Sequence, residues 1–132
     1  KDDAIQRIGT ILSREAGAPR KRVTKVAQSA VLRARDFLLS HSDEPVRSTT
    51  LEDITGLDRY ALARHFRQLL GTSPHRYLVM RRLSRAKQLL LAGSNLAGAA
   101  VESGFADQAH LTRHFHDAFG ITPGRWLALQ GG

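Results

Sequence analysis

One segment of this chain occurs twice, and this repeat constrains the fold more than any other feature of the sequence. Residues 58–78 and 107–127 align without a gap when the sequence is shifted by 49 positions, from 58 to 107. The shift superposes an Arg-His-Phe triplet, a glycine and a proline, and it places Tyr77 on Trp126. Agreement of this kind indicates one supersecondary unit that is present twice.

Each copy has the pattern of a helix that ends at a glycine and is followed by a new helix. Gly71 and Gly120 stand where a helix would end in a left-handed cap. A hydroxyl residue and a proline then follow, which are expected to cap and open the next helix. Apolar side chains at positions i and i+4 predict the buried side of the first helix of each copy: Leu62, Phe66, Leu111 and Phe115.

A short helical segment precedes each copy and completes the unit. Before the second copy, Asn95 is the expected N-cap, and the small residues Ala99 and Ala100 would let two helices cross closely. Before the first copy, Thr49 and Glu52 have the spacing of a capping box. A short helix, a glycine turn and a second helix that carries arginine together follow the helix-turn-helix plan.

Two longer amphipathic helices are predicted outside the repeated segments. Residues 24–40 should form the supporting helix of the first unit, and residues 74–92 should form a helix of about 30 Å that joins the two units. Its arginines should point outward. The side chains expected to face the core are Val26, Ala27, Ala30, Val31, Ala34 and Leu38 on the supporting helix, and Tyr77, Leu83, Ala86 and Leu90 on the joining helix.

The charge distribution favours a polyanionic partner. The 132-residue chain has a net charge of +8, and it has no acidic residue from position 59 to position 101. A stretch of one sign attracts a polyanion, although a solvated basic face is the simpler alternative. The basic residues within it are Arg59, Arg64, Arg67, Arg76, Arg81, Arg82, Arg85 and Lys87. The chain has no cysteine, which excludes disulfides and cysteine-ligated metal.

The repeat and its motifs resemble a known family. Residues 104–115 read Gly-Phe-x-Asp-Gln-x-His-Leu-x-Arg-x-Phe, and residues 120–123 read Gly-Ile-Thr-Pro. With the double unit, these motifs resemble the DNA-binding domain of AraC/XylS-type transcription regulators, over about residues 29–128. Two positions depart from the family pattern. Glu52 stands where the family usually has alanine and where the second copy has Ala100, and Leu127 stands where an arginine often follows the final aromatic residue.

The resemblance implies an all-α fold and a role in transcription. About seven helices are expected, with two helix-turn-helix units joined by one long helix, plus an N-terminal amphipathic helix at residues 2–16. The implied function is sequence-specific binding of double-stranded DNA, as the output domain of a bacterial transcription regulator whose two recognition helices enter successive major-groove segments. Residues 1–22 are then an N-terminal helix and basic linker, the remnant of a missing regulatory domain. Residues 23–94 form the first unit with the joining helix, and residues 95–132 form the second unit.

The resemblance also implies which residues contact DNA. Recognition helices are expected at about 58–70 and 107–119, with Asp107 as a cap. Base contacts are expected from Tyr60, Ala63, Arg64, Gln108, Ala109, Thr112 and Arg113, with His110 as a further candidate. Arginine matches two acceptors of guanine, and glutamine can pair with adenine. Backbone contacts are expected from Thr49, Thr50, Arg59, Arg67, Arg81, Arg85 and Asn95. A surface ion pair for Arg64 and a core position for Tyr60 are the alternatives.

The partners expected from the resemblance are double-stranded DNA, RNA polymerase and a regulatory domain that binds a small-molecule effector. No cofactor is expected. No apolar run approaches the length of a membrane span and no secretory signal is visible, so the cytoplasm, with association to the nucleoid, is the expected location.

Other classes of function have weaker support in the sequence. His110 and His114 share a helix face and could bind zinc, but they lack a following glutamate and a cysteine, and His114 repeats as His65 beside the same Arg-Phe pair. No nucleophile with a neighbouring base and no phosphate loop appear, so an enzyme is not expected. The main alternative is a basic helical module that binds an acidic protein partner.

Overall fold

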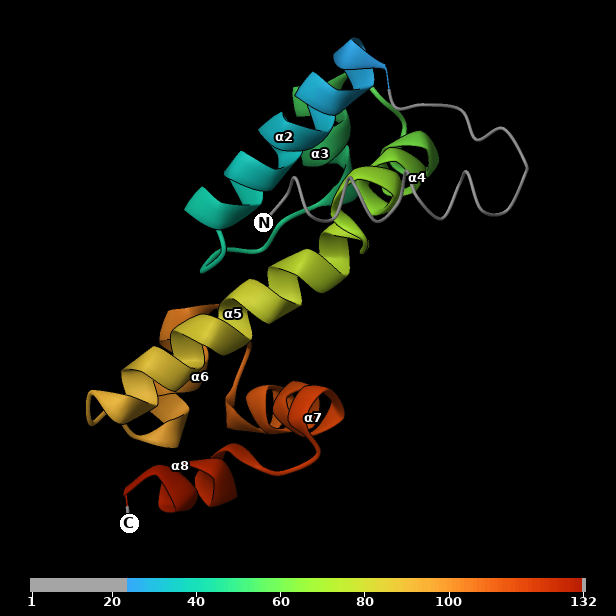
Figure 1. The fold of residues 1–132 in the computed structure, drawn as a ribbon. Helices are drawn as coiled ribbons and strands as arrows, with labels where there is room; N and C mark the ends of the chain where they lie inside the picture. Colours follow the sequence, from blue (N-terminus) through green and yellow to red (C-terminus); the bar gives the residue numbers. More distant parts are fainter. Residues whose placement is uncertain (1–23, 132) are drawn as a thin grey trace, which may run out of the picture. The chain divides into compact units, whose positions relative to one another are not determined.

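The computed structural model describes residues 24–131, which form seven helices and no strand (Figure 1). This result confirms the all-α fold class, whereas the helix predicted at residues 2–16 lies outside the described residues. None of the described helices is long and apolar enough to cross a membrane. The helices are α2 (Lys25–Ser40), α3 (Ser48–Thr55), α4 (Arg59–Leu70), α5 (Pro74–Leu91), α6 (Leu96–Ser103), α7 (Gln108–Phe119) and α8 (Pro123–Gly131).

The described residues fall into two compact units, and the division lies inside α5. The first compact unit contains residues 24–40 and 46–77, and the second contains residues 41–45 and 78–131. The sequence placed the boundary later, between residues 94 and 95. The difference arises because α5 from Leu78 onward buries its apolar side chains together with those of α6 and α7.

In the first compact unit, α2 packs against α3 and α4, and α3 packs against α4. Leu62 and Phe66 of α4 are buried as predicted, and the ring of Tyr77 meets the Phe66 ring edge-on, with centroids 5.6 Å apart. The predicted apolar side of α2 is buried at five of its six positions. The exception is Val26, which is 78% exposed because it lies about a quarter of a turn away from the line of buried residues that Ala27, Ala30 and Ala34 form along α2.

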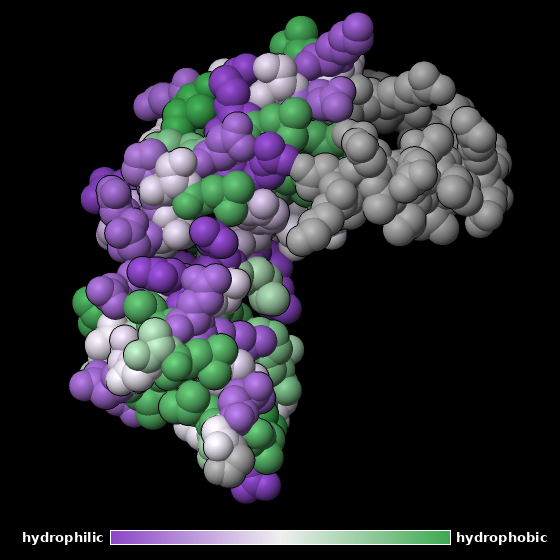
Figure 2. Space-filling view, turned by 60° about the vertical axis from the view of Figure 1, so that its left-hand side comes forward, coloured by the Kyte–Doolittle hydropathy of each residue, from purple (hydrophilic) through white to green (hydrophobic). Residues whose placement is uncertain are grey.

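The core of the second compact unit forms where α5, α6 and α7 meet. Leu83 and Ala86 of α5 and Phe115 of α7 are buried in one cluster with Ala100 and Phe105. The buried small residues of α6 confirm the close helix crossing that the sequence predicted. On the face of the described part that Figure 2 shows, hydrophilic residues alternate with small groups of hydrophobic ones.

Helix ends follow the sequence closely, with one exception. Gly71 and Gly120 end their helices with φ values of 81° and 78°, in the left-handed region that glycine adopts without strain. The Asn95 side chain accepts a hydrogen bond from the backbone N–H of Gly98, which confirms it as an N-cap. The predicted capping box of α3 is wrong. The N-cap residue of α3 is Arg47, which has no side-chain cap bond.

The prediction that the arginines of the joining helix point outward is wrong for Arg82. This side chain is buried. Its Nε donates a hydrogen bond to the carbonyl oxygen of Ser42, and its Nη2 donates one to the carbonyl oxygen of Glu44, each with a length of 2.7 Å. Burial lowers the pKa of Arg82, and Asp43 opposes this shift. Arg82 therefore fixes residues 41–45 within the second compact unit, although they follow α2 directly in the chain. By contrast, Arg81 and Arg85 are exposed.

Candidate nucleic-acid interface

The first recognition helix, α4, presents its predicted contact residues outward. Asp58 caps the helix by accepting hydrogen bonds from the N–H groups of Tyr60 (3.0 Å) and Ala61 (2.8 Å). Tyr60 is 78% exposed, which rules out the alternative that it is a core aromatic residue. Arg64 is exposed and Ala63 is half-buried. Because Leu62 and Phe66 hold the opposite side of α4 in the core, these three positions remain on the outer side.

The two arginines at equivalent places in the repeat have the same environment. Arg64 on α4 and Arg113 on α7 are both exposed. Within residues 24–131, neither guanidinium has a hydrogen bond or ion pair, so the surface ion pair considered for Arg64 is not observed there. The N–H donors of both guanidinium groups are therefore available to a ligand.

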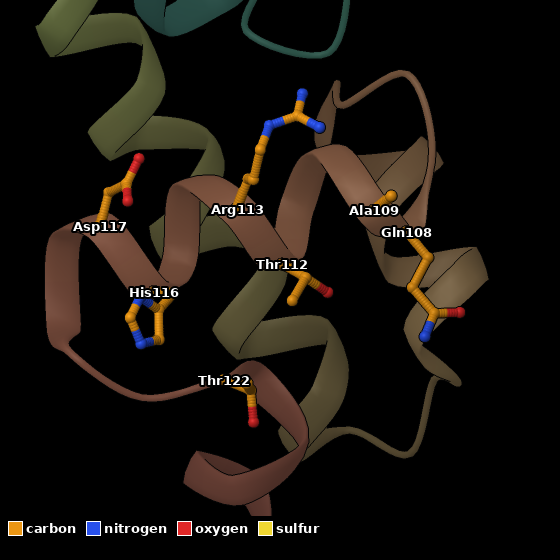
Figure 3. Close-up of a pocket in the computed structure, with 7 residues that line it drawn as sticks. All are labelled: Gln108, Ala109, Thr112, Arg113, His116, Asp117 and Thr122. Carbon is orange, nitrogen blue, oxygen red and sulfur yellow. The ribbon is translucent and has the colours of Figure 1, made fainter.

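The second recognition helix lines an open hollow of about 710 Å³. Its wall contains all four residues that were predicted to contact bases from this helix, and Figure 3 shows them along α7. Thr122 lies across the hollow from this row, just before α8, and its hydroxyl is turned toward α8, where it accepts a hydrogen bond from the N–H of Arg125. The hollow is lined by Gln108, Ala109, Thr112, Arg113, His116, Asp117 and Thr122.

Three of these lining residues were not identified from the sequence as contacts. His116 lies one helical turn after Thr112, and Asp117 lies one turn after Arg113, so each shares a side of α7 with a predicted contact residue. The repeat carried a signal for His116, because the shift of 49 positions places it on Arg67, which was predicted to lie near the DNA backbone. Thr122 was predicted only as a helix cap, and its position on the hollow depends on how α8 packs against α7.

The predicted backbone contacts occupy different local environments. Thr49 and Thr50 lie in the first turn of α3 rather than at its cap, and Asn95 uses its side-chain oxygen to cap α6. Arg67 is exposed on α4. Lys87, which belongs to the basic run, is turned inward. Its Nζ lies 3.7 Å from the centre of the Phe119 ring.

Arg59 differs from the other predicted backbone contacts because it is already paired. Glu52 of α3 accepts hydrogen bonds from the backbone N–H of Arg59 at 2.8 Å and from its Nε at 3.3 Å. Hydrogen bonds from Arg59 hold the pKa of Glu52 below its ordinary value of 4.5. This pair links α3 to the start of the recognition helix α4. The short helices α3 and α6, which precede the recognition helices, are the positioning helices of the two units.

The lowered pKa gives a testable dependence of stability on pH. A carboxylate whose folded-state pKa is lowered adds stability above its ordinary pKa and loses it as the pH falls through the folded value. We therefore expect Glu52→Gln to lower the melting temperature at pH 7, and we expect this difference to close on acidification below about pH 4. Thermal unfolding between pH 7 and pH 3 measures it. Asp53→Asn, which removes the same charge from the next residue, is the control, and an equal gap for both variants would contradict the expectation.

His110 and His114 are joined to each other by a hydrogen bond. Their Nε2 atoms lie 3.0 Å apart, and the Nδ1 atom of His110 accepts the backbone N–H of Ala106 at 3.1 Å. His110 therefore carries its proton on Nε2 when neutral and donates it to His114. Metal coordination at the His110 Nε2 would force a proton onto Nδ1, against the Ala106 N–H group. These hydrogen bonds connect the turn before α7 to the first two turns of that helix. The pair therefore fits a structural role better than the zinc site considered from the sequence.

Comparison with known proteins places this geometry in a family. A family model described as a helix-turn-helix domain matches residues 51–128. The HTH-type transcriptional regulator YbfI of Bacillus subtilis is 37% identical over 76 residues, which cover 58% of this chain and 28% of YbfI. The HTH-type transcriptional activator RhaS of an Enterobacter strain is 32% identical over 100 residues, which cover 71% of this chain and 36% of RhaS. The chain spans about a quarter of the length of the first curated relatives that it matches.

Solved structures show the same fold. The DNA-binding domain of AdpA, solved in complex with a target DNA, superposes with a TM-score of 0.70 at 26% identity, over 76% of this chain and 91% of that one. An AraC-type regulator from Chromobacterium violaceum gives a TM-score of 0.69 at 28% identity, over 79% of this chain and 94% of that one. With the family match over residues 51–128 and the two helix-turn-helix units in place, the chain belongs to the AraC-type helix-turn-helix family of transcription regulators.

Proposed function

We propose that this chain binds double-stranded DNA at a specific sequence and that α4 and α7 are its two recognition helices. The observation that carries the proposal is the hollow on α7, where the four predicted base-contacting side chains stand together and open to solvent. The equivalent positions of α4 are also on the outer side of their helix. The complex of the AdpA DNA-binding domain with its target DNA supports the proposal by similarity of fold.

The side chains on the two helices suit the major groove. Arg64 and Arg113 would donate to O6 and N7 of guanine, and Gln108 would pair with adenine through its amide. The exposed arginines Arg67, Arg81 and Arg85 would contact phosphates, and so would Thr49, Thr50 and Asn95 at the starts of the positioning helices. Arg59 is not in this set, because Glu52 already engages its side chain.

The length of the joining helix α5 supports contacts of α4 and α7 with two separate segments of the DNA major groove. This helix is continuous over 18 residues, which corresponds to about 27 Å at the usual helical rise. One turn of DNA brings the major groove back to the same face after about 34 Å. We propose that the two recognition helices enter successive major-groove segments on one side of the DNA.

The role of the whole protein is also a proposal, since the chain spans only part of its relatives. Those relatives are transcription regulators by their names, which supports a role for this chain as the DNA-binding output of such a regulator. We propose that a small-molecule effector acts on a regulatory part outside the chain, that RNA polymerase is a partner, and that the protein works in the cytoplasm on the nucleoid.

Selection of binding sites from random duplex DNA with the 132-residue chain tests the proposed function. We expect a defined sequence with two conserved blocks about one helical turn apart, and an affinity that falls steeply with salt. The alternative, a basic module for an acidic protein partner, predicts no enriched DNA sequence. Failure to enrich any sequence at moderate salt would refute the proposal and favour that alternative.

Arg85→Ala tests the phosphate contacts of the joining helix. Loss of one phosphate contact should weaken binding to all sequences alike and lower the slope of log K against log salt by about 0.9. Titration of the selected site and of a scrambled duplex over a range of salt concentrations measures both quantities. A change in base preference would instead indicate that Arg85 reads sequence.

A further inference from the structure

The two helix-turn-helix units differ at the start of the recognition helix. Measured from the turn glycines, Gly56 and Gly104, Glu52 of α3 corresponds to Ala100 of α6. Ala100 is fully buried and carries no charge. Glu52 is only partly covered, and its carboxylate accepts three hydrogen bonds from Arg59, at 2.8 Å from the backbone N–H, 3.3 Å from Nε and 3.5 Å from Nη2.

Two carboxylates therefore occupy the N-terminus of α4. Glu52 accepts the N–H of Arg59, while Asp58 accepts the next two N–H groups, those of Tyr60 and Ala61. The bond to the backbone N–H holds the Glu52 carboxylate at this place even when the Arg59 side chain turns away. A fixed negative charge therefore stands beside the first residue of the recognition helix.

The equivalent part of α7 is arranged differently. The shift of 49 positions places Gln108 on Arg59, and Gln108 lines the hollow on α7. The capping residue Asp107 accepts one helical N–H group with its side chain, that of His110. The second helix therefore offers its first side chain to a ligand, whereas the first helix pairs its exposed first side chain with a carboxylate of its own chain.

We propose that Glu52 is a positioning residue that retains Arg59, so that α4 contacts DNA through Tyr60 and Arg64 without a phosphate contact from Arg59. This inference rests on the proposed DNA-binding function. Glu52 engages the Nε and Nη2 donors of Arg59, so a phosphate must compete with the carboxylate for the guanidinium, and when Arg59 leaves Glu52, that carboxylate faces a polyanion without its counter-charge. Like charges at short range repel, so the exchange gains less than a free arginine would gain.

Glu52→Gln is the variant that separates these effects. Glutamine keeps an oxygen that accepts the N–H of Arg59, but it removes the charge that retains the guanidinium. We expect binding to the selected site and to a scrambled duplex to strengthen alike, by about two- to fivefold, which is the range of an exposed ion pair. The slope of log K against log salt should become steeper by about 0.9, the value for one added phosphate contact.

The control variants show whether Arg59 is responsible. Arg59→Ala alone leaves the Glu52 carboxylate without its counter-charge, so it should weaken binding to both duplexes alike by no more than about two- to fivefold, and it should leave the salt slope unchanged because the parent makes no phosphate contact through Arg59. The double variant Glu52→Gln, Arg59→Ala should lose the gain in affinity and in salt slope. Asp53→Asn, which removes the same charge from α3 without releasing Arg59, should give a smaller gain and no change in slope.

Two results would overturn the inference. If Arg59→Ala weakens binding by tenfold or more and Glu52→Gln weakens it too, then Glu52 presents Arg59 to DNA instead of withholding it. If Glu52→Gln strengthens binding equally in the Arg59→Ala background, then Glu52 acts only through its own charge. Both results require a parent chain that binds its selected site, whereas failure of the parent to bind would refute the proposed function itself.

Discussion

Replacement of Arg113 by alanine is expected to weaken specific DNA binding by about 1–3 kcal/mol and to relax the preference at one or two base pairs. Arg113 is exposed on the wall of the α7 hollow, beside the other side chains proposed to contact bases. Its fork of donors would match one guanine, and no other side chain of α7 offers the same geometry. Site selection with the variant measures the relaxed position directly.

Arg64→Ala is the matched variant on the first helix. It should have a cost of the same size, but the relaxed base pairs should lie about one helical turn from those of Arg113→Ala. Since the two residues belong to different compact units, the costs should add in the double variant. The proposal of two separate readers fails if both variants relax the same base pair, or if either keeps the full preference of the parent chain.

Gly104→Ala is expected to destabilise the second compact unit by about 3–5 kcal/mol, from a strained backbone and the loss of charge-assisted hydrogen bonds. Gly104 has φ +108°, and a Cβ there would lie 2.4 Å from the carbonyl oxygen of Ser42 and 2.7 Å from the Nε of Arg82. These two atoms form the bond that fixes residues 41–45 in this unit. The methyl group must therefore displace a buried arginine or a backbone carbonyl.

Gly56→Ala is the control for this experiment. Gly56 ends α3 as Gly104 ends α6, with φ +72°, but nothing lies within 4 Å of the position of its Cβ. We therefore expect only the conformational cost of a left-handed residue, about 1–2 kcal/mol. Urea unfolding of both variants gives the comparison. Equal losses would mean that the contact between Gly104 and residues 41–45 adds nothing to stability.

Much of the fold was predictable because its signals are local. The spacing of Leu62 and Phe66, repeated at Leu111 and Phe115, requires only that one side of a helix be buried, and all four are buried. The helices end at glycines because the left-handed backbone conformation after the last turn is unstrained only for glycine. The repeat then placed both recognition helices within about one residue of their observed starts.

The candidate site was predictable in part. The resemblance to the family implied that Gln108, Thr112 and Arg113 face the DNA from the second recognition helix, and all three line one hollow on α7. Thr122 lines the same hollow because α8 packs against α7, and the spacing of residues within α7 could not predict this packing. His116 had a signal in the repeat, through its alignment with Arg67.

The sequence by itself determined where the helices begin and end, which side of each is apolar, and that the unit occurs twice. These properties depend on hydrogen bonds and burial within a few residues of each other. Only the tertiary structure decided which partners the long charged side chains bind. Glu52 has the spacing of a cap but pairs with Arg59, and Arg82 lies in a basic run but is buried against the carbonyl groups of Ser42 and Glu44. A charged group turns to whichever partner the folded chain brings within hydrogen-bonding distance, and that partner can be distant in the sequence.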